Sequence, residues 1–259
     1  MGGVQMLRVV FFVILLVGSM GSLLAQRLTI YCEEDPPLQM MGADGKLTGL
    51  IVEIVTEIQK RVGNQDAIEM VPWARGYDAV QKQPNTVLFS VSRTAERNPL
   101  FHWIGPELEA SYSFYARADS KIVIRTLEEA KKLKRVGVYI DDVRDSFLTQ
   151  AGFKNLDRTS NNTQNFKKLM AGRLDVYASA SISIEDEARV AGYKASEVKK
   201  VYTFMRAQLY IVLSKGTPAG VVKAWSEAFA SMQKDGSFGS LHRKYYPALP
   251  LPGKAITAF

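Results

Sequence analysis

The stretch Phe89-Ser90-Val91-Ser92-Arg93-Thr94-Ala95-Glu96-Arg97 follows a strand-like apolar run and predicts a site for a small anion. Ser90 and Ser92 supply hydroxyl groups at the end of the strand, where backbone N–H groups also become free to donate. Arg97, three residues after Thr94, can bind a carboxylate through two parallel hydrogen bonds. The alternative is a surface loop with an incidental arginine. The rest of the sequence helps to decide between an anion site and such a loop.

Strands and helices alternate on both sides of this stretch, which is typical of an α/β fold with largely parallel sheets. Before it we expect strands over 28–32, 68–71 and 86–91 and helices over 50–62 and 74–82. After it the pattern restarts, with strands over 136–139 and 176–178 and helices over 142–151 and 184–191. A short helix that opens at Thr126-Leu127 and a helix capped by Asn161 or Asn162 and ending at Gly172 lie among them. A strand over 208–213 and helices over 219–233 and 238–245 complete the chain.

Two similar α/β blocks joined by two crossings predict a two-lobed protein with a cleft between the lobes. We expect lobe 1 to comprise 26–115 and 208–259, and lobe 2 to comprise 116–207, each with a mixed, mostly parallel sheet flanked by helices. The crossings would lie near Tyr115 and near Gln208.

The first 25 residues predict a secretory signal peptide. Arg8 precedes a short apolar core over 9–17, and small residues lead to a cleavage site after Ala25. An uncleaved membrane anchor is the alternative, but the apolar run is short for a bilayer span. We therefore expect a chain that begins near Gln26 and resides in the periplasm.

Composition narrows the function classes. The formal net charge of +7 favours an anionic ligand, but the basic residues are scattered without interleaved aromatic residues, which argues against nucleic-acid binding. The single cysteine, Cys32, permits no intramolecular disulfide and is expected to be a buried, inert thiol. His102 is expected to pack near Trp103 and His242 to lie on a helix surface, without metal-ligand spacing. We expect no metal and no cofactor.

Five motifs in order carry a family resemblance. They are Leu47-Thr48-Gly49-Leu50, Ser90 to Arg97, Leu133-Lys134-Arg135-Val136-Gly137-Val138, Met170-Ala171-Gly172-Arg173-Leu174-Asp175 and Lys234-Asp235-Gly236-Ser237-Phe238. From about Leu28 to Pro247 the chain resembles periplasmic solute-binding protein family 3, the amino-acid-type receptors of bacterial ABC importers. The resemblance implies the type II periplasmic binding protein fold.

The resemblance also implies roles for residues of the first lobe. Arg97 would bind the ligand carboxylate, with Ser90 and Ser92 as flanking hydrogen-bonding groups. Glu34 and Asp35 lie where the family's first loop lines the cleft. Trp73 and Arg75 open the second helix and could meet the ligand, although a core aromatic residue and a solvated arginine are the plain alternatives.

The second lobe departs from the family pattern. Asp141-Asp142-Val143-Arg144 stands where the family has Gly-Thr-Thr or Gly-Thr-Ser, which makes Asp142 and Arg144 candidate ligand-binding residues. Ala180 stands where the family has the aspartate that holds the ligand ammonium. Either Asp142 replaces that aspartate or the ligand carries no α-amino group.

The sequence thus favours a monomeric extracytoplasmic receptor that captures a small carboxylate-bearing solute, an amino acid or related organic acid, for an ABC permease. One alternative is an exported enzyme resembling cyclohexadienyl dehydratase, with Glu34 or Asp142 as general acid. Another is a sensory module that acts through a separate signalling partner.

Overall fold

The computed structural model describes residues 27–254, so the predicted signal peptide lies outside the described residues. The first part of the chain forms β1 (Thr29–Cys32), β2 (Met40–Met41), β3 (Leu47–Thr48), α1 (Leu50–Val62), β4 (Ile68–Met70), α2 (Trp73–Lys82), β5 (Thr86–Ser92), the 3-10 helix η1 (Asn98–Leu100) and β6 (Phe101–Arg117). The second part forms α3 (Leu127–Ala130), β7 (Val136–Tyr139), α4 (Val143–Gln150), β8 (Leu156–Thr159), α5 (Asn162–Met170), β9 (Val176–Ala180), α6 (Ile184–Ala191), the 3-10 helix η2 (Ala195–Glu197), β10 (Val198–Ser214), α7 (Ala219–Asp235) and α8 (Ser237–Tyr245).

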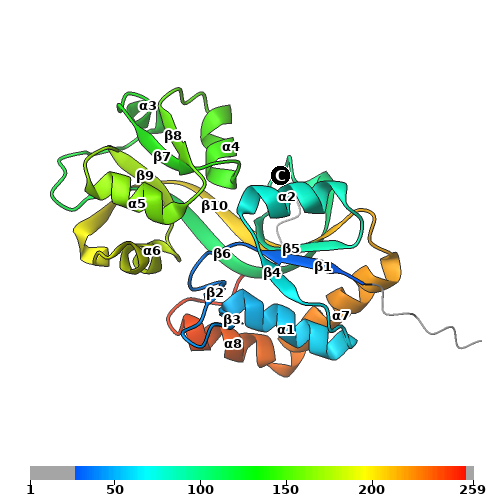
Figure 1. The fold of residues 1–259 in the computed structure, drawn as a ribbon. Helices are drawn as coiled ribbons and strands as arrows, with labels where there is room; N and C mark the ends of the chain where they lie inside the picture. The colour runs from blue at the N-terminus through cyan, green and yellow to red at the C-terminus, as the bar shows by residue number, and fades with distance from the viewer. Residues whose placement is uncertain (1–26, 255–259) are drawn as a thin grey trace, which may run out of the picture.

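One sheet with the strand order β4-β1-β5-β10-β6-β9-β7-β8 runs through two lobes (Figure 1). In the first lobe β1 pairs in parallel with β4 and β5. In the second lobe β7 pairs in parallel with β8 and β9. The long strands β6 and β10 are antiparallel to each other and to their neighbours β9 and β5. The expected two-lobed α/β fold is confirmed, but the strands of both lobes belong to one continuous mixed sheet instead of two separate ones.

The lobes are joined by paired strands. β6 and β10 run side by side from Phe101 opposite Ser214 to Arg117 opposite Val198. The sequence analysis expected a crossing near Tyr115. In the structure Tyr115 pairs with Tyr177 of β9, so it lies within the strands of the second lobe. Between Leu108 and Ser111 the strand β6 has β10 as its only partner in the described sheet.

Local sequence signals set several of the helix ends. Gly49 precedes α1 with φ +126°, and a Cβ there would lie 2.4 Å from Leu38 O, so glycine is required. The Thr126 hydroxyl caps α3 by accepting from the Glu129 N–H at 3.2 Å. Asn161 caps α5 by accepting from the Gln164 N–H at 2.9 Å.

Each lobe has its own apolar core. In the first lobe Leu50 and Ile54 of α1 pack with Trp225 and Phe229 of α7 beneath the sheet. In the second lobe the cluster includes Phe114, Val136, Val138 and Leu148, all buried. The lobes also share apolar contacts: Tyr139 of β7 belongs to a cluster with Val71 and Trp73 of the first lobe, so these contacts break if the lobes separate.

Two expectations about single residues have different outcomes. Cys32 is fully buried, as expected, and burial raises its thiol pKa to about 12. His242 is buried between Phe238 and Tyr246, so the expected position on a helix surface is wrong. The charged neighbours Arg243 and Lys244 suggested an exposed turn, but α8 turns His242 toward the core. Burial lowers the His242 pKa. Within 27–254 no helix has the length and apolarity needed to cross a bilayer.

Candidate functional site

A cavity of about 40 Å³ lies between the two lobes and gathers most of the predicted site residues. Its lining includes Asp35, Trp73, Ser90, Ser92 and Arg97 from the first lobe and Asp142, Arg144 and Ala180 from the second. The volume holds only a few water molecules, so the lobes are closed on each other in this conformation.

Arg97 is the most exceptional group in this cavity. Its side chain is buried, at 6% exposure, and its guanidinium carbon lies 5.4 Å from the ring centre of Trp73 and 4.8 Å from that of Tyr77. Within the described part of the chain the guanidinium makes no ion pair or hydrogen bond. The hydrogen bonds of Arg97 are made by its backbone, whose N–H donates to Thr94 Oγ1 at 3.3 Å and whose carbonyl oxygen accepts from the Leu100 N–H at 3.0 Å. The two rings stabilise the cation and fix its plane, which leaves its N–H groups for an anion.

The two serines are already bonded within the first lobe. Ser90 has φ +61°, donates its hydroxyl to Gln39 Oε1 at 3.0 Å and its N–H to Glu107 Oε2 at 3.2 Å. Burial raises the pKa of Glu107 to about 8, so this carboxyl is protonated at neutral pH. Ser92 shares a 2.7 Å hydrogen bond with the hydroxyl of Tyr112 on β6. Their backbone and hydroxyls are therefore held rigidly at the cavity wall.

The second lobe contributes an internal ion pair. Asp142 accepts hydrogen bonds from the backbone N–H groups of Arg144 and Asp145, at 2.8 and 3.0 Å, and so caps α4. Its other oxygen accepts from Arg144 Nε, and Arg144 Nη1 reaches Ala178 O at 3.4 Å. Both partners are buried. Asp142 and Arg144 thus satisfy each other before any ligand arrives.

Two carboxyl groups of the first lobe face this pair. Burial raises the pKa of Glu33 well above its ordinary value, and the nearby Asp35 raises it further. Burial also raises the pKa of Asp35 to about 6, against the lowering effect of Arg144. Neither carboxylate has a cation within ion-pair distance in the described chain.

Two predicted residues lie elsewhere. Glu34 is exposed and lines a separate cavity, because successive side chains at the end of β1 point to opposite faces and Glu33 takes the inward position. Arg75 is absent from the lining of the central cavity; its side chain is 62% exposed and lies 3.3 Å from Glu69 Oε1. The solvated arginine that the sequence left open is what the structure shows.

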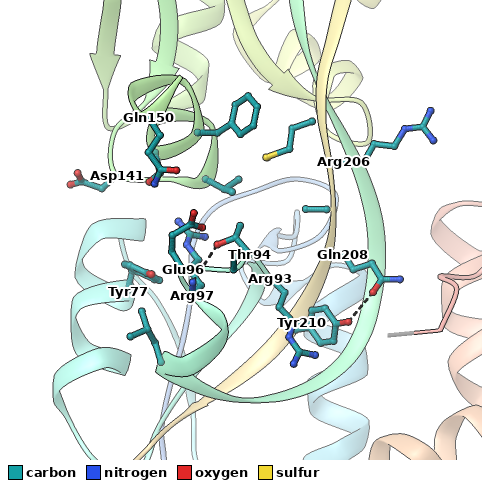
Figure 2. Close-up of a pocket in the computed structure, with 17 residues that line it drawn as sticks. Tyr77, Arg93, Thr94, Glu96, Arg97, Asp141, Gln150, Arg206, Gln208 and Tyr210 are labelled. Atoms are coloured by element: carbon teal, nitrogen blue, oxygen red, sulfur yellow. Dashed lines mark hydrogen bonds between the residues drawn. The ribbon is translucent and has the colours of Figure 1, made fainter. Parts of the chain in front are cut away.

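A larger cavity of about 430 Å³ adjoins the central one, and Arg97 and Val143 line both. Figure 2 shows Thr94, Glu96 and Arg97 on one side of it and Asp141 and Gln150 on the other. Phe147 of α4, with Met205 and Ala207 of β10, adds apolar surface. We call this space the outer cavity. Its volume lies within the range of small-molecule sites in proteins.

A direct hydrogen bond links the two lobes beside Arg97. Trp73 Nε1 on α2 donates to the carbonyl oxygen of Asp141 at 2.9 Å. Asp141 has φ +61°, a left-handed conformation that turns this carbonyl toward the first lobe. Trp73 therefore packs on the guanidinium of Arg97 with one face and holds the second lobe with its N–H.

The model of the bacterial extracellular solute-binding proteins, family 3, matches residues 28–248. The chain belongs to this family. It is 26% identical over 218 residues to the L-cystine-binding protein TcyJ of Escherichia coli K12, with 82% of this chain and 79% of that protein covered. It is also 26% identical over 230 residues to the histidine-binding periplasmic protein of the same strain, with 81% and 83% covered.

A solved structure shows the same fold. The sensor domain of a histidine kinase with similarity to periplasmic binding proteins has a TM-score of 0.77 and 21% identity, and the match covers 86% of this chain and 98% of that domain. The family assignment from five sequence motifs is thus confirmed.

Several cavity residues of this family 3 protein were not foreseen. Glu33 was missed because sequence does not show which of two adjacent acids points inward. Tyr112 was not singled out, although its alternation with Ser111 and Ser113 was a usable signal. Ser183 lies in a turn directly before α6, and Glu187, buried on α6, lines the neighbouring cavity; neither was singled out.

Proposed function

We propose that this protein is a periplasmic receptor for a small carboxylate-bearing solute of the amino-acid class, which it presents to an ABC permease. One observation carries the proposal: the buried guanidinium of Arg97 lies between the lobes without an anionic partner in the described chain. A buried cation without a partner costs on the order of several kcal/mol, and a bound carboxylate offsets this cost.

Closure follows from the same geometry. The central cavity is too small to admit a solute while Trp73 is bonded to Asp141. The solute therefore enters when the lobes separate and is bound by both when they close. The bending segment would comprise 108–111 of β6 and 205–208 of β10, where the two strands pair mainly with each other.

The outer cavity would take the side chain of the solute. Arg97 and Val143 line both cavities, so a ligand whose carboxylate binds Arg97 can extend past them toward Phe147 and Met205. The curated relatives named for cystine and histidine are receptors for amino acids with extended side chains. This likeness supports the amino-acid class without selecting a member.

A thermal-shift screen tests the function. The chain from Gln26 would be tested against amino acids, keto acids, dicarboxylates and short peptides, because a ligand that binds only the native state raises the melting temperature. Hits would be titrated by calorimetry. If no compound in these classes raises the melting temperature of the protein, the proposal is contradicted.

Export and assembly complete the proposal. We expect cleavage after Ala25, which places the mature protein free in the periplasm, and a monomer, because a single chain forms both sides of the cleft. Mass spectrometry of the periplasmic fraction checks the first point, and light scattering checks the second. A full-length mass in the membrane fraction would indicate an anchored protein instead.

An enzyme on the same scaffold is the second candidate. Asp35, with its pKa raised by burial to about 6, is a carboxyl that can donate a proton near neutral pH, as a dehydratase requires. Incubating each bound ligand with the protein and analysing it by mass spectrometry distinguishes the two. A receptor returns its ligand unchanged.

A further inference from the structure

The central cavity carries more acidic than basic side chains. Glu33 and Asp35 approach it from the first lobe, and Asp142 lines it from the second, with Glu187 close behind. Arg144 is the cation common to this cluster, because it acts on the pKa of Glu33, Asp35 and Glu187. It is already bonded to Asp142.

Asp142 has little capacity for another cation. One of its oxygens accepts two backbone N–H groups and the other accepts Arg144 Nε. Withdrawing it toward a ligand would uncap α4 and break a buried ion pair. Ala180, at the same cavity wall, offers no polar atom in its side chain.

Unused acceptors lie nearby. Glu33 Oε2 is buried and has no hydrogen-bond partner. Ser183, at 1% exposure, lines the same cavity from the second lobe. Its hydroxyl is near enough to Asp35 to lower the pKa of that carboxyl, but its oxygen has no hydrogen-bond partner at normal length. A fully buried hydroxyl without a partner is costly, so a group that bonds it stabilises the closed form.

We infer that the ligand carries a cationic amino group, and that this group binds the Glu33 and Asp35 carboxylates of the first lobe, with the Ser183 hydroxyl as an acceptor from the second. An ammonium has three N–H donors, which matches three acceptor groups. This assignment rests on the proposed receptor function and specifies its ligand as an amino acid or another amino-bearing acid. The cation-binding role that the sequence left to Asp142 moves to the first loop.

The test uses pairs of probes that differ only in the amino group. The wild-type protein would be titrated with the standard L-amino acids and L-cystine, and with the des-amino counterpart of each compound that binds. We expect the des-amino counterpart to bind at least a hundredfold more weakly. Glu33→Gln and Asp35→Asn should each weaken the amino-bearing ligand tenfold or more and leave the weak binding of its counterpart unchanged.

Glu34→Gln is the matched control, since Glu34 lies between the two residues in sequence but is exposed and outside the cavity. Its affinity should equal that of the wild type. Circular dichroism would confirm that all three variants fold. If Glu33→Gln and Asp35→Asn both bind as tightly as wild type, or the des-amino compound binds equally well, the inference is overturned while the receptor function stands. If the wild type binds none of the amino-bearing or des-amino acids, both are overturned.

Discussion

Arg97 and Arg144 occupy opposite walls of one cavity and are equally buried, at 6% exposure each, yet their surroundings differ. Arg144 is bonded to Asp142 and lies among the carboxyl and phenol groups of its own lobe. Arg97 rests on two aromatic rings and bonds no carboxylate in the described chain. The Arg144 charge is therefore satisfied within the folded protein. The Arg97 charge has no such partner and could bind an anionic ligand.

The largest expected effect comes from removing the paired arginine. Arg144→Met should lower the free energy of unfolding by about 3–5 kcal/mol, because it leaves Asp142 buried without its cation. Urea denaturation measures this. If the variant is as stable as wild type, Arg144 is not structural and the contrast with Arg97 fails.

Removing the unpaired arginine should act on binding instead. Arg97→Ala should weaken the ligand by on the order of a hundredfold or more, because a bidentate charge-assisted contact is lost. Arg97→Lys should also bind poorly, because an ammonium lacks the planar fork. Calorimetry measures affinity, and urea denaturation should show wild-type stability within about 1 kcal/mol. Wild-type affinity in either variant would show that Arg97 is not the anchor.

These two predictions separate what the sequence could show from what it could not. The placement of Ser90, Ser92 and Arg97 at one wall of the central cavity could be predicted, because a strand end, two serines and Thr94 are local features. The pairing of Arg144 with Asp142 was not, because both residues appeared as ligand candidates and only the helix cap shows that they serve each other.

Helices and strands were likewise predictable where their sequence signals are local. The strand over 136–139 and the helix over 184–191 were predicted with their observed bounds, since alternation and capping signals are local. The full length of β6 and β10 was not predicted, because Gly105 and Pro106 interrupt the first strand and Lys199 and Lys200 interrupt the apolar residues at the start of the second. β8 was missed as well, since Leu156–Thr159 is a short and polar edge strand.

A third buried charge is neutralised by a proton. Burial raises the pKa of Glu107 to about 8, whereas an unfolded glutamate titrates near 4.3. Between these values the folded state keeps a proton that the unfolded state has lost, so stability falls as pH rises from about 5 to 8. Glu107→Gln should reduce that slope, by about 1 kcal/mol per pH unit. Urea denaturation at pH 5 and pH 8 compares the two proteins, and equal slopes would contradict the assignment.

The contact between the lobes should have a smaller effect. Trp73→Phe keeps an aromatic ring beneath Arg97 but removes the hydrogen bond to Asp141 O. Loss of one such bond, about 1 kcal/mol, should weaken the ligand about fivefold by disfavouring closure. Stopped-flow fluorescence of the remaining tryptophans would place the change in the dissociation rate. A hundredfold loss would mean that Trp73 contacts the ligand itself.

The smallest effect is expected at Arg75, the third arginine considered for the site. Its contact with Glu69 joins two exposed side chains, and such pairs contribute about 0–1 kcal/mol. Arg75→Ala should match wild type in both affinity and stability. A marked loss of affinity would place Arg75 at the cleft in a conformation that differs from the closed one.

The paired strands β6 and β10 also bear on how such a chain can be divided. Ser111 of β6 lies opposite Arg206 of β10, so the chain leaves the first lobe and returns to it at neighbouring positions. Residues 112–205 are thus an insertion whose two ends meet, and a two-residue turn of the kind that closes β-hairpins could replace them. The second lobe is an exchangeable module: a lobe from a relative, joined at Ser111 and Arg206, would bring its own wall of the cleft to an unchanged Arg97.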